Sequence, residues 1–100
     1  VQLTEIAPEH RLAFCRQALA DREPLVRRFA VRRCQDLPRA DALALLLGHL
    51  RDEPEPAVWR AAHAVLRHFQ PAIGDYTEVR TDTARDRAVA LAAWQATVSP

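Results

Sequence analysis

Side chains that commonly carry catalysis are scarce in this sequence, and their spacing does not suit it. The only serine is Ser99, and Cys15 and Cys34 fall at apolar helical positions, where a buried thiol is inert. His63 and His68 are five residues apart and point about 140° apart around a helix, so they cannot share a metal ion. Neither glycine belongs to a phosphate-binding loop. We therefore expect no catalytic residue, no metal site, no cofactor and no small-molecule substrate.

Arginine is the residue type that this sequence offers for binding. All 14 cationic residues are arginines and the net charge is +1, so attraction to an anionic partner must come from a local patch. If residues 24–37 and 56–69 are helices with their apolar arcs aligned, most of the opposite face is cationic. We call this face the arginine strip, and its expected members are Arg27, Arg28, Val31, Arg32 and Gln35 on the first helix and Trp59, Arg60, His63, Arg67 and Gln70 on the second.

The arginine strip has three interpretations. It could bind an acidic protein segment through paired arginine–carboxylate hydrogen bonds, or a phosphate backbone with Trp59 stacked on a base. It could also be an ordinary solvated face whose arginines pair with Asp21, Asp36, Asp52 and Glu55. Trp59 could instead pack against the last helix or the loop before it. The expected contact residues are Arg28, Arg32, Trp59, Arg60, His63 and Arg67.

Apolar periodicity and proline positions predict the elements that carry this strip. Prolines 8, 24 and 56 suit first helical positions, and prolines 38 and 71 end the helices before them. Thr83 is an expected N-cap with Asp86 three residues on. The stretch 71–83 has no period and is predicted to be a loop, either a plain connector or a binding segment carrying Tyr76, Glu78 and Arg80. The predicted helices cover 8–20, 24–37, 39–51, 56–69 and 84–97.

Each predicted helix has an apolar arc that defines the expected core. The helix over 39–51 is apolar nearly all round and should be sandwiched between neighbours. Cys15 and Cys34 should be displaced by about 7 Å along the axes of antiparallel helices, which argues against a disulfide. Two free thiols favour a reducing, cytoplasmic compartment. The expected arcs are Leu12, Cys15 and Leu19; Val26, Phe29, Ala30, Cys34 and Leu37; Leu43, Leu46, Leu47 and Leu50; Val58, Ala61, Ala62, Val65, Leu66 and Phe69; and Ala88, Leu91, Ala92 and Val98.

The sequence repeats itself at a period of 31–32 residues. The segment 23–30 aligns with 55–62 at an offset of 32, and Leu12 and Leu19 align with Leu43 and Leu50 at an offset of 31. The one residue of difference falls in the second turn. Two helices and an acidic turn repeated at this period are typical of a solenoid, in which each hairpin buries its surplus apolar face on the next.

The repeat resembles the HEAT repeat. An apolar helix, a turn aspartate and then Pro-x-Val-Arg-x-x-Ala match Asp21, Pro24, Val26, Arg27 and Ala30, and the second unit departs from the pattern at one place, where Trp59 replaces the arginine. The resemblance implies a brace between Arg27 and the turn aspartates, Asp21 or Asp52. It also implies that the helices over 24–37 and 56–69 line a concave face. The segment after Phe69 resembles the capping element of some bacterial HEAT arrays.

These observations predict an all-α superhelix of two helical hairpins and a capping helix. We expect one domain over 1–100, with repeat one at 7–37, repeat two at 38–70, the loop at 71–83 and the capping helix at 84–97, as an excerpt of a larger protein. The expected function is that of a non-enzymatic scaffold that binds another protein or a neighbouring domain through its concave face. The alternative is a nucleic-acid-binding domain that uses the arginine strip. No membrane partner is expected, since no apolar run is long enough to span a bilayer.

Overall fold

The computed structural model describes residues 5–74 and 83–98, and within these ranges the regular structure is entirely helical. Three α-helices begin at a proline, and each of the predicted helices is present. The elements are α1 (Pro8–Leu19), α2 (Pro24–Arg33), the 3-10 helix η2 (Cys34–Asp36), α3 (Arg39–Leu50), α4 (Pro56–Phe69) and α5 (Ala84–Val98). The all-α expectation is therefore confirmed for the described residues.

Prolines and one threonine set where the helices begin. Pro8, Pro24 and Pro56 occupy first-turn positions, where a missing N–H leaves no hydrogen bond unmade. The side chain of Thr83 accepts a hydrogen bond from the backbone N–H of Asp86 at 3.0 Å, so the predicted N-cap of α5 is confirmed. Local sequence thus explains the starts of four helices.

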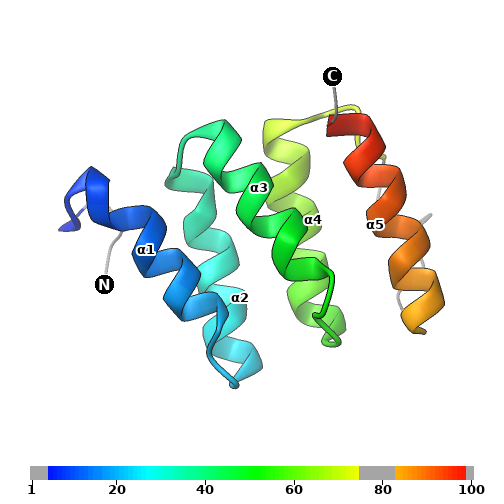
Figure 1. Ribbon diagram of the computed structural model, residues 1–100, viewed down its shortest axis with the longest axis horizontal. Helices are drawn as coiled ribbons and strands as arrows, with labels where there is room; N and C mark the ends of the chain where they lie inside the picture. The colour runs from blue at the N-terminus through cyan, green and yellow to red at the C-terminus, as the bar shows by residue number, and fades with distance from the viewer. Residues whose placement is uncertain (1–4, 75–82, 99–100) are drawn as a thin grey trace.

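The five α-helices of the described residues form two layers. One layer contains α1, α3 and α5, in which α3 contacts both of the others, and the second contains α2 and α4, which pack along each other. Figure 1 shows the helices following one another across the view in chain order, with α1 at one end of the row and α5 at the other. The α1–α2 and α3–α4 contacts join the layers, and the core lies between them.

The core is built mainly from leucines of α3 and from apolar side chains of α4. Leu43, Leu46, Leu47 and Leu50 are all buried, as the apolar character of this helix predicted. Ile73, from the segment after α4, is also buried, and Leu91 and Trp94 bring α5 into the same cluster. The α5 arc differs from the prediction, since Ala88 and Ala92 are exposed while Ala90 and Trp94 are buried.

The predicted buried face of α2 is wrong by part of a turn. Val26 and Phe29 were expected inside but are exposed, whereas Val31, placed in the arginine strip, is fully buried. The sequence pattern could not decide this because, within the described residues, α2 packs mainly against α1 and α4, which leaves Val26 and Phe29 exposed on its remaining side. The last predicted turn of this helix tightens into η2 at Cys34.

The two cysteines are free thiols, as the prediction against a disulfide expected, and their side chains nevertheless interact. Both thiols are fully buried, and their side chains form a hydrogen bond between α1 and η2. Helical side chains lean toward the N-terminus of their own helix, and in this antiparallel pair that tilt brings Cys15 and Cys34 together despite an axial offset. The hydrogen bond to Cys34 lowers the pKa of Cys15. The same bond and burial raise the pKa of Cys34 far above its ordinary value.

The two helix-opening turns have the same backbone geometry. Glu23 and Glu55 precede the prolines with φ/ψ of −83°/121° and −85°/119°. The carboxylate of Asp21 accepts a hydrogen bond from the Glu23 amide at 2.8 Å, and that of Glu53 accepts one from the Glu55 amide at 3.1 Å. Glu53, not Asp52, is therefore the residue equivalent to Asp21. The loop residues Tyr76, Glu78 and Arg80 lie outside the described residues.

Candidate functional site

A buried carboxylate organises the turn between α3 and α4. Glu53 is almost fully buried. Its Oε1 accepts a hydrogen bond from Arg27 Nε at 2.7 Å, and it also lies 2.7 Å from His49 Nε2. Arg27 Nη2 donates to Oε2 at 2.9 Å, which completes a bidentate pair. Such a pair fixes two planar groups in one orientation. It therefore ties the start of α2 to the turn of the following hairpin.

The expected brace exists, but its acid is not the one that the sequence indicated. Arg27 pairs with Glu53 rather than with the carboxylate of Asp21 or Asp52, and Asp52 is exposed. Arg27 Nη1 also donates to the carbonyl oxygens of Asp21 and Arg22, at 3.1 and 2.8 Å. The carboxylate of Asp21 is used instead to cap its own turn. An offset of 32 residues maps Glu53 onto Asp21, and this alignment is the signal that could have identified it.

The charges of this cluster stabilise each other. Burial raises the pKa of Glu53, but hydrogen bonds from Arg27, His49 and the Glu55 amide outweigh burial, so the pKa lies below its ordinary value. The hydrogen bond to Glu53 likewise raises the pKa of Arg27. The ionised pair is therefore the stable form near neutral pH. The groups around the Glu53 carboxylate, Arg27, His49 and the Glu55 amide, come from the helices and the turn that it joins. The cluster therefore has a structural role.

Trp59 belongs to the core and cannot serve as a surface contact. Its side chain is fully buried, and its ring lies 5.5 Å from that of Trp94, centroid to centroid, which joins α4 to α5. Its indole Nε1–H donates to the carbonyl oxygen of Glu53 at 2.6 Å. Of the two sequence interpretations, packing against the last helix is the one that the structure has. The exposed-contact interpretation is wrong because α5 covers this face of α4.

His63 is also removed from the arginine strip by burial. Its Nε2 lies 2.6 Å from the carbonyl oxygen of Gly74, and its ring lies 5.4 Å from that of Trp94. The residue is almost fully buried beneath α5. Its expected role as a contact residue is wrong for the same reason as that of Trp59, because α5 and the segment around Gly74 cover this side of α4.

Three of the remaining arginines of the strip, Arg28, Arg32 and Arg60, line a groove between α2 and α4. The groove has a volume of about 690 Å³. Arg28 and Arg32 come from α2, whereas α4 contributes Arg60 and a row of small side chains. Arg67 is exposed on α4 but does not line the groove. We call this feature the α2–α4 groove, and its lining is Arg28, Arg32, Arg33, Gln35 and Asp36 from the first hairpin and Ala57, Arg60, Ala61, Ala64 and Val65 from α4.

The α2–α4 groove combines positive charge with a shallow apolar floor. Asp36 is its single acid against four arginines. Within the described residues, Arg28 and Arg32 form no ion pair and no side-chain hydrogen bond. These two arginines therefore lack the acidic partners that the solvated-face interpretation expected for them. Alanine side chains on the opposite wall leave room for a ligand's backbone to approach.

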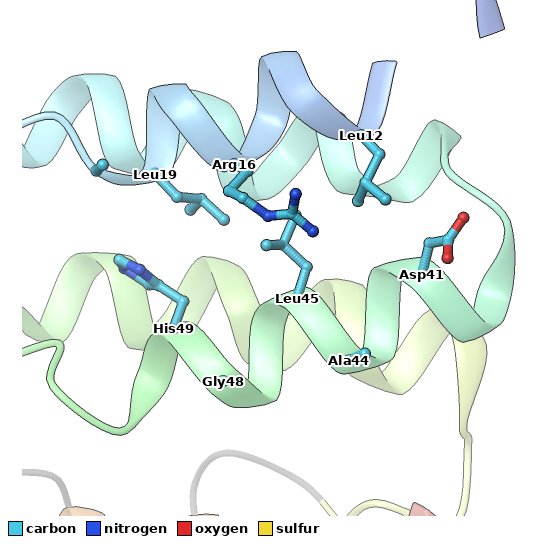
Figure 2. Close-up of a pocket in the computed structure, with 9 residues that line it drawn as sticks. Leu12, Arg16, Leu19, Asp41, Ala44, Leu45, Gly48 and His49 are labelled. Carbon is cyan, nitrogen blue, oxygen red and sulfur yellow. The ribbon is translucent and has the colours of Figure 1, made fainter. Parts of the chain in front are cut away.

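A second depression lies in the other layer, between α1 and α3. It measures about 420 Å³. Figure 2 shows Arg16 of α1 and Leu45 of α3 pointing into the space between the two helices, with Leu12 and Asp41 toward one end. Leucines on both walls make this depression more apolar than the α2–α4 groove, and Arg16 and Asp41 bring opposite charges to it. It therefore lacks the excess of one charge that would select a partner.

Two kinds of site are not found among the described residues. No group of three or more His, Cys, Asp or Glu side chains could hold a metal ion. No helix within 5–74 or 83–98 is long and apolar enough to cross a membrane. The α2–α4 groove is thus the feature of the described surface with the clearest chemical preference.

Comparison of the chain with protein-family models, curated proteins and solved structures finds no match. The function must therefore be argued from the geometry and charge of the molecule itself.

Proposed function

We propose that the chain is a short HEAT-like α-α superhelix and serves as a non-enzymatic protein-binding module. Support for the superhelix comes from the two turns, whose backbone angles and carboxylate caps match residue for residue. The two-layer arrangement of hairpins, with α5 packed on α3 and its Trp94 against Trp59 of α4, supports two repeats and a capping helix. The Arg27–Glu53 pair supplies the brace between them.

The observation that carries the binding function is the α2–α4 groove. It presents Arg28 and Arg32, which have no charged partner of their own within the described residues, beside a floor of alanines. A guanidinium group binds a carboxylate through two parallel hydrogen bonds. A segment of another protein that carries glutamates or aspartates would therefore neutralise this groove. The low relief suits an extended or helical segment better than a small molecule.

The nucleic-acid alternative is less well supported. It relied on Trp59 as a platform for base stacking, and Trp59 is buried in the core. The net charge of +1 provides no general attraction to a polyanion. What remains is a group of arginines, and arginines alone could hold a phosphate backbone only through salt-sensitive contacts.

A binding experiment with two fluorescent probes tests the proposal. The probes are a Glu/Ala peptide of about four helical turns and a single-stranded DNA of similar length. We expect the peptide to bind the protein and the double variant Arg28→Glu, Arg32→Glu to bind it at least about tenfold more weakly. The control is Arg16→Glu, Arg51→Glu, which changes the net charge equally but on exposed residues of α1 and of the turn after α3.

The outcomes separate the two functions. Equal loss of peptide binding in both double variants would show a net-charge effect and contradict the groove as the site. DNA binding that exceeds peptide binding and falls steeply between low and moderate salt would favour the alternative. Absence of DNA binding even at low salt would eliminate it.

A further inference from the structure

Exposed apolar side chains are concentrated on one helix. Leu25 is 77% exposed, Phe29 40% and Val26 37%. All three lie in the first two turns of α2. Within the described residues the only other large hydrophobic side chain that is comparably exposed is Val89 of α5, which stands alone. Scattered apolar residues on a surface are ordinary, whereas three on one short helix form a patch.

The second repeat shows what covers the equivalent patch. At an offset of 32, Val26 and Phe29 correspond to Val58 and Ala61 of α4. Val58 is fully buried and Ala61 is partly buried, and Ala61 faces α2 across the α2–α4 groove. In α4 this face is therefore covered by a helix laid alongside. Among the described residues, α2 packs mainly against α1 and α4, and the corresponding face of α2 stays exposed at Leu25, Val26 and Phe29.

The charge of α2 indicates which kind of helix could cover its exposed apolar face. Four of the ten residues of α2 are arginines and none is acidic. The guanidinium of Arg33 lies over the ring of Phe29, 5.1 Å from its centroid, so a cation sits beside the patch itself. Arg28 and Arg32 have no acidic partner within the described residues. A helix that approaches α2 must therefore offer carboxylates as well as an apolar stripe.

We propose that the open side of α2, formed by Leu25, Val26, Phe29 and Arg33, is a docking site for an acidic amphipathic helix of another protein. The partner helix lies along α2 as α2 lies along α4. Its apolar residues, one turn apart, contact Leu25 and Phe29. Its carboxylates, in the following turn, reach the arginines toward the end of α2. This site adjoins the α2–α4 groove, because Arg33 belongs to both. Leu25, Val26 and Phe29 do not line the groove, so substitutions of these residues test the docking site alone.

A second copy of this chain fits the site less well. Two copies related by a two-fold axis would place one α2 against another, and each contributes four arginines and no acid. Like charges opposed across an interface cost free energy. A head-to-tail copy would have to present the far side of α4, which is covered by α5 and the segment around Gly74. The acidic helix avoids both problems.

A synthetic helix provides the probe. The peptide is alanine-based and about four turns long, with two leucines spaced i and i+4 and three glutamates in the next turn, and it carries a fluorophore for anisotropy. A matched peptide has glutamine in place of each glutamate. The protein variants are the double substitution Leu25→Ala, Phe29→Ala and, as a matched control, Val89→Ala, which removes an exposed apolar side chain from α5.

We expect the acidic peptide to bind, and the Leu25→Ala, Phe29→Ala variant to bind it at least about tenfold more weakly, because the apolar anchors are lost. Val89→Ala should bind within about twofold of the original protein. The glutamine peptide should bind at least about fivefold more weakly than the acidic one. Far-UV circular dichroism should show unchanged helix content in each variant, since the substituted side chains are exposed.

Three results would overturn the proposal. The first is no binding of the acidic peptide, and the second is equal binding by the Leu25→Ala, Phe29→Ala variant. The third is a concentration-dependent dimer in sedimentation that this variant abolishes, which would assign the patch to self-association. The groove is tested separately, by the binding of the Glu/Ala peptide to the Arg28→Glu, Arg32→Glu variant. That peptide lacks the leucines that the docking site on α2 requires. Failure of one site is thereby distinguishable from failure of the other.

Discussion

Trp59 does for the second turn what Arg27 does for the first. The two residues are equivalent at an offset of 32, as are Glu53 and Asp21. Arg27 Nη1 donates to the carbonyl oxygen of Asp21 at 3.1 Å, and Trp59 Nε1 donates to that of Glu53 at 2.6 Å. Both turns thus keep a side-chain hydrogen bond to the turn carbonyl oxygen, although the donor is a guanidinium in the first turn and an indole in the second. The second contact of each side chain differs: Arg27 also pairs with the Glu53 carboxylate, whereas the ring of Trp59 packs against Trp94.

Removing the Arg27 side chain should destabilise the fold far more than removing its neighbour. Arg27→Met leaves the Glu53 carboxylate buried without its main partner, and we expect a loss of about 3 kcal/mol in the free energy of unfolding. Arg28→Met provides the control, because Arg28 makes no ion pair within the described residues, and it should change stability by less than about 0.5 kcal/mol. Urea denaturation followed by circular dichroism measures both. Equal losses would show that the Arg27–Glu53 pair contributes nothing specific.

The same carboxylate should make stability fall in acid. The folded-state pKa of Glu53 lies below its ordinary value of 4.5, so the unfolded chain binds the proton more readily. The contribution is therefore complete above about pH 4.5 and is lost as the pH falls through the lower folded-state pKa. In urea titrations between neutral pH and about pH 3, Glu53→Gln should flatten this acid limb. Asp52→Asn, at the exposed neighbouring position, should leave it as it is, and an unchanged limb in Glu53→Gln would contradict the assignment.

The sequence predicted the helices better than the surfaces they expose. Pro24 and Pro56 mark helix starts through chemistry that is local to the chain, so their roles could be read directly. Val31 could not be assigned, because whether it is buried depends on where α4 lies against α2. Glu53 was missed because the turn was aligned on the residue type of Asp52, although the 32-residue offset maps Glu53 onto Asp21. The hydrogen bonds that Glu53 accepts from Glu55 and Arg27 confirm that register. Burial of Trp59 required the position of α5.

Substitutions of Trp59 should distinguish a core residue from a contact residue. Trp59→Phe removes the indole donor and leaves the Glu53 carbonyl without this bond, at a cost of about 1–2 kcal/mol. Trp59→Ala also leaves a cavity beside Trp94, and we expect a loss of about 3–5 kcal/mol. Unfolding in urea gives the values, and tryptophan emission should shift to the red as each variant unfolds. If Trp59→Ala retained full stability, the ring would have to be at the surface, against its observed burial.

The buried thiols offer an independent measure of how the fold opens. Cys15 and Cys34 are both fully buried and hydrogen-bonded to each other, so a bulky thiol reagent can react only when the packing of α1 on η2 opens. We expect labelling in the folded protein to be slower than in urea-unfolded protein by at least about a hundredfold. If that opening is global unfolding, the Arg27→Met variant should label about a hundredfold faster than the original protein, which is the rate equivalent of about 3 kcal/mol. A labelling rate that Arg27→Met does not change would show that α1 opens locally, with the Arg27–Glu53 pair and the α2–α4 packing still in place.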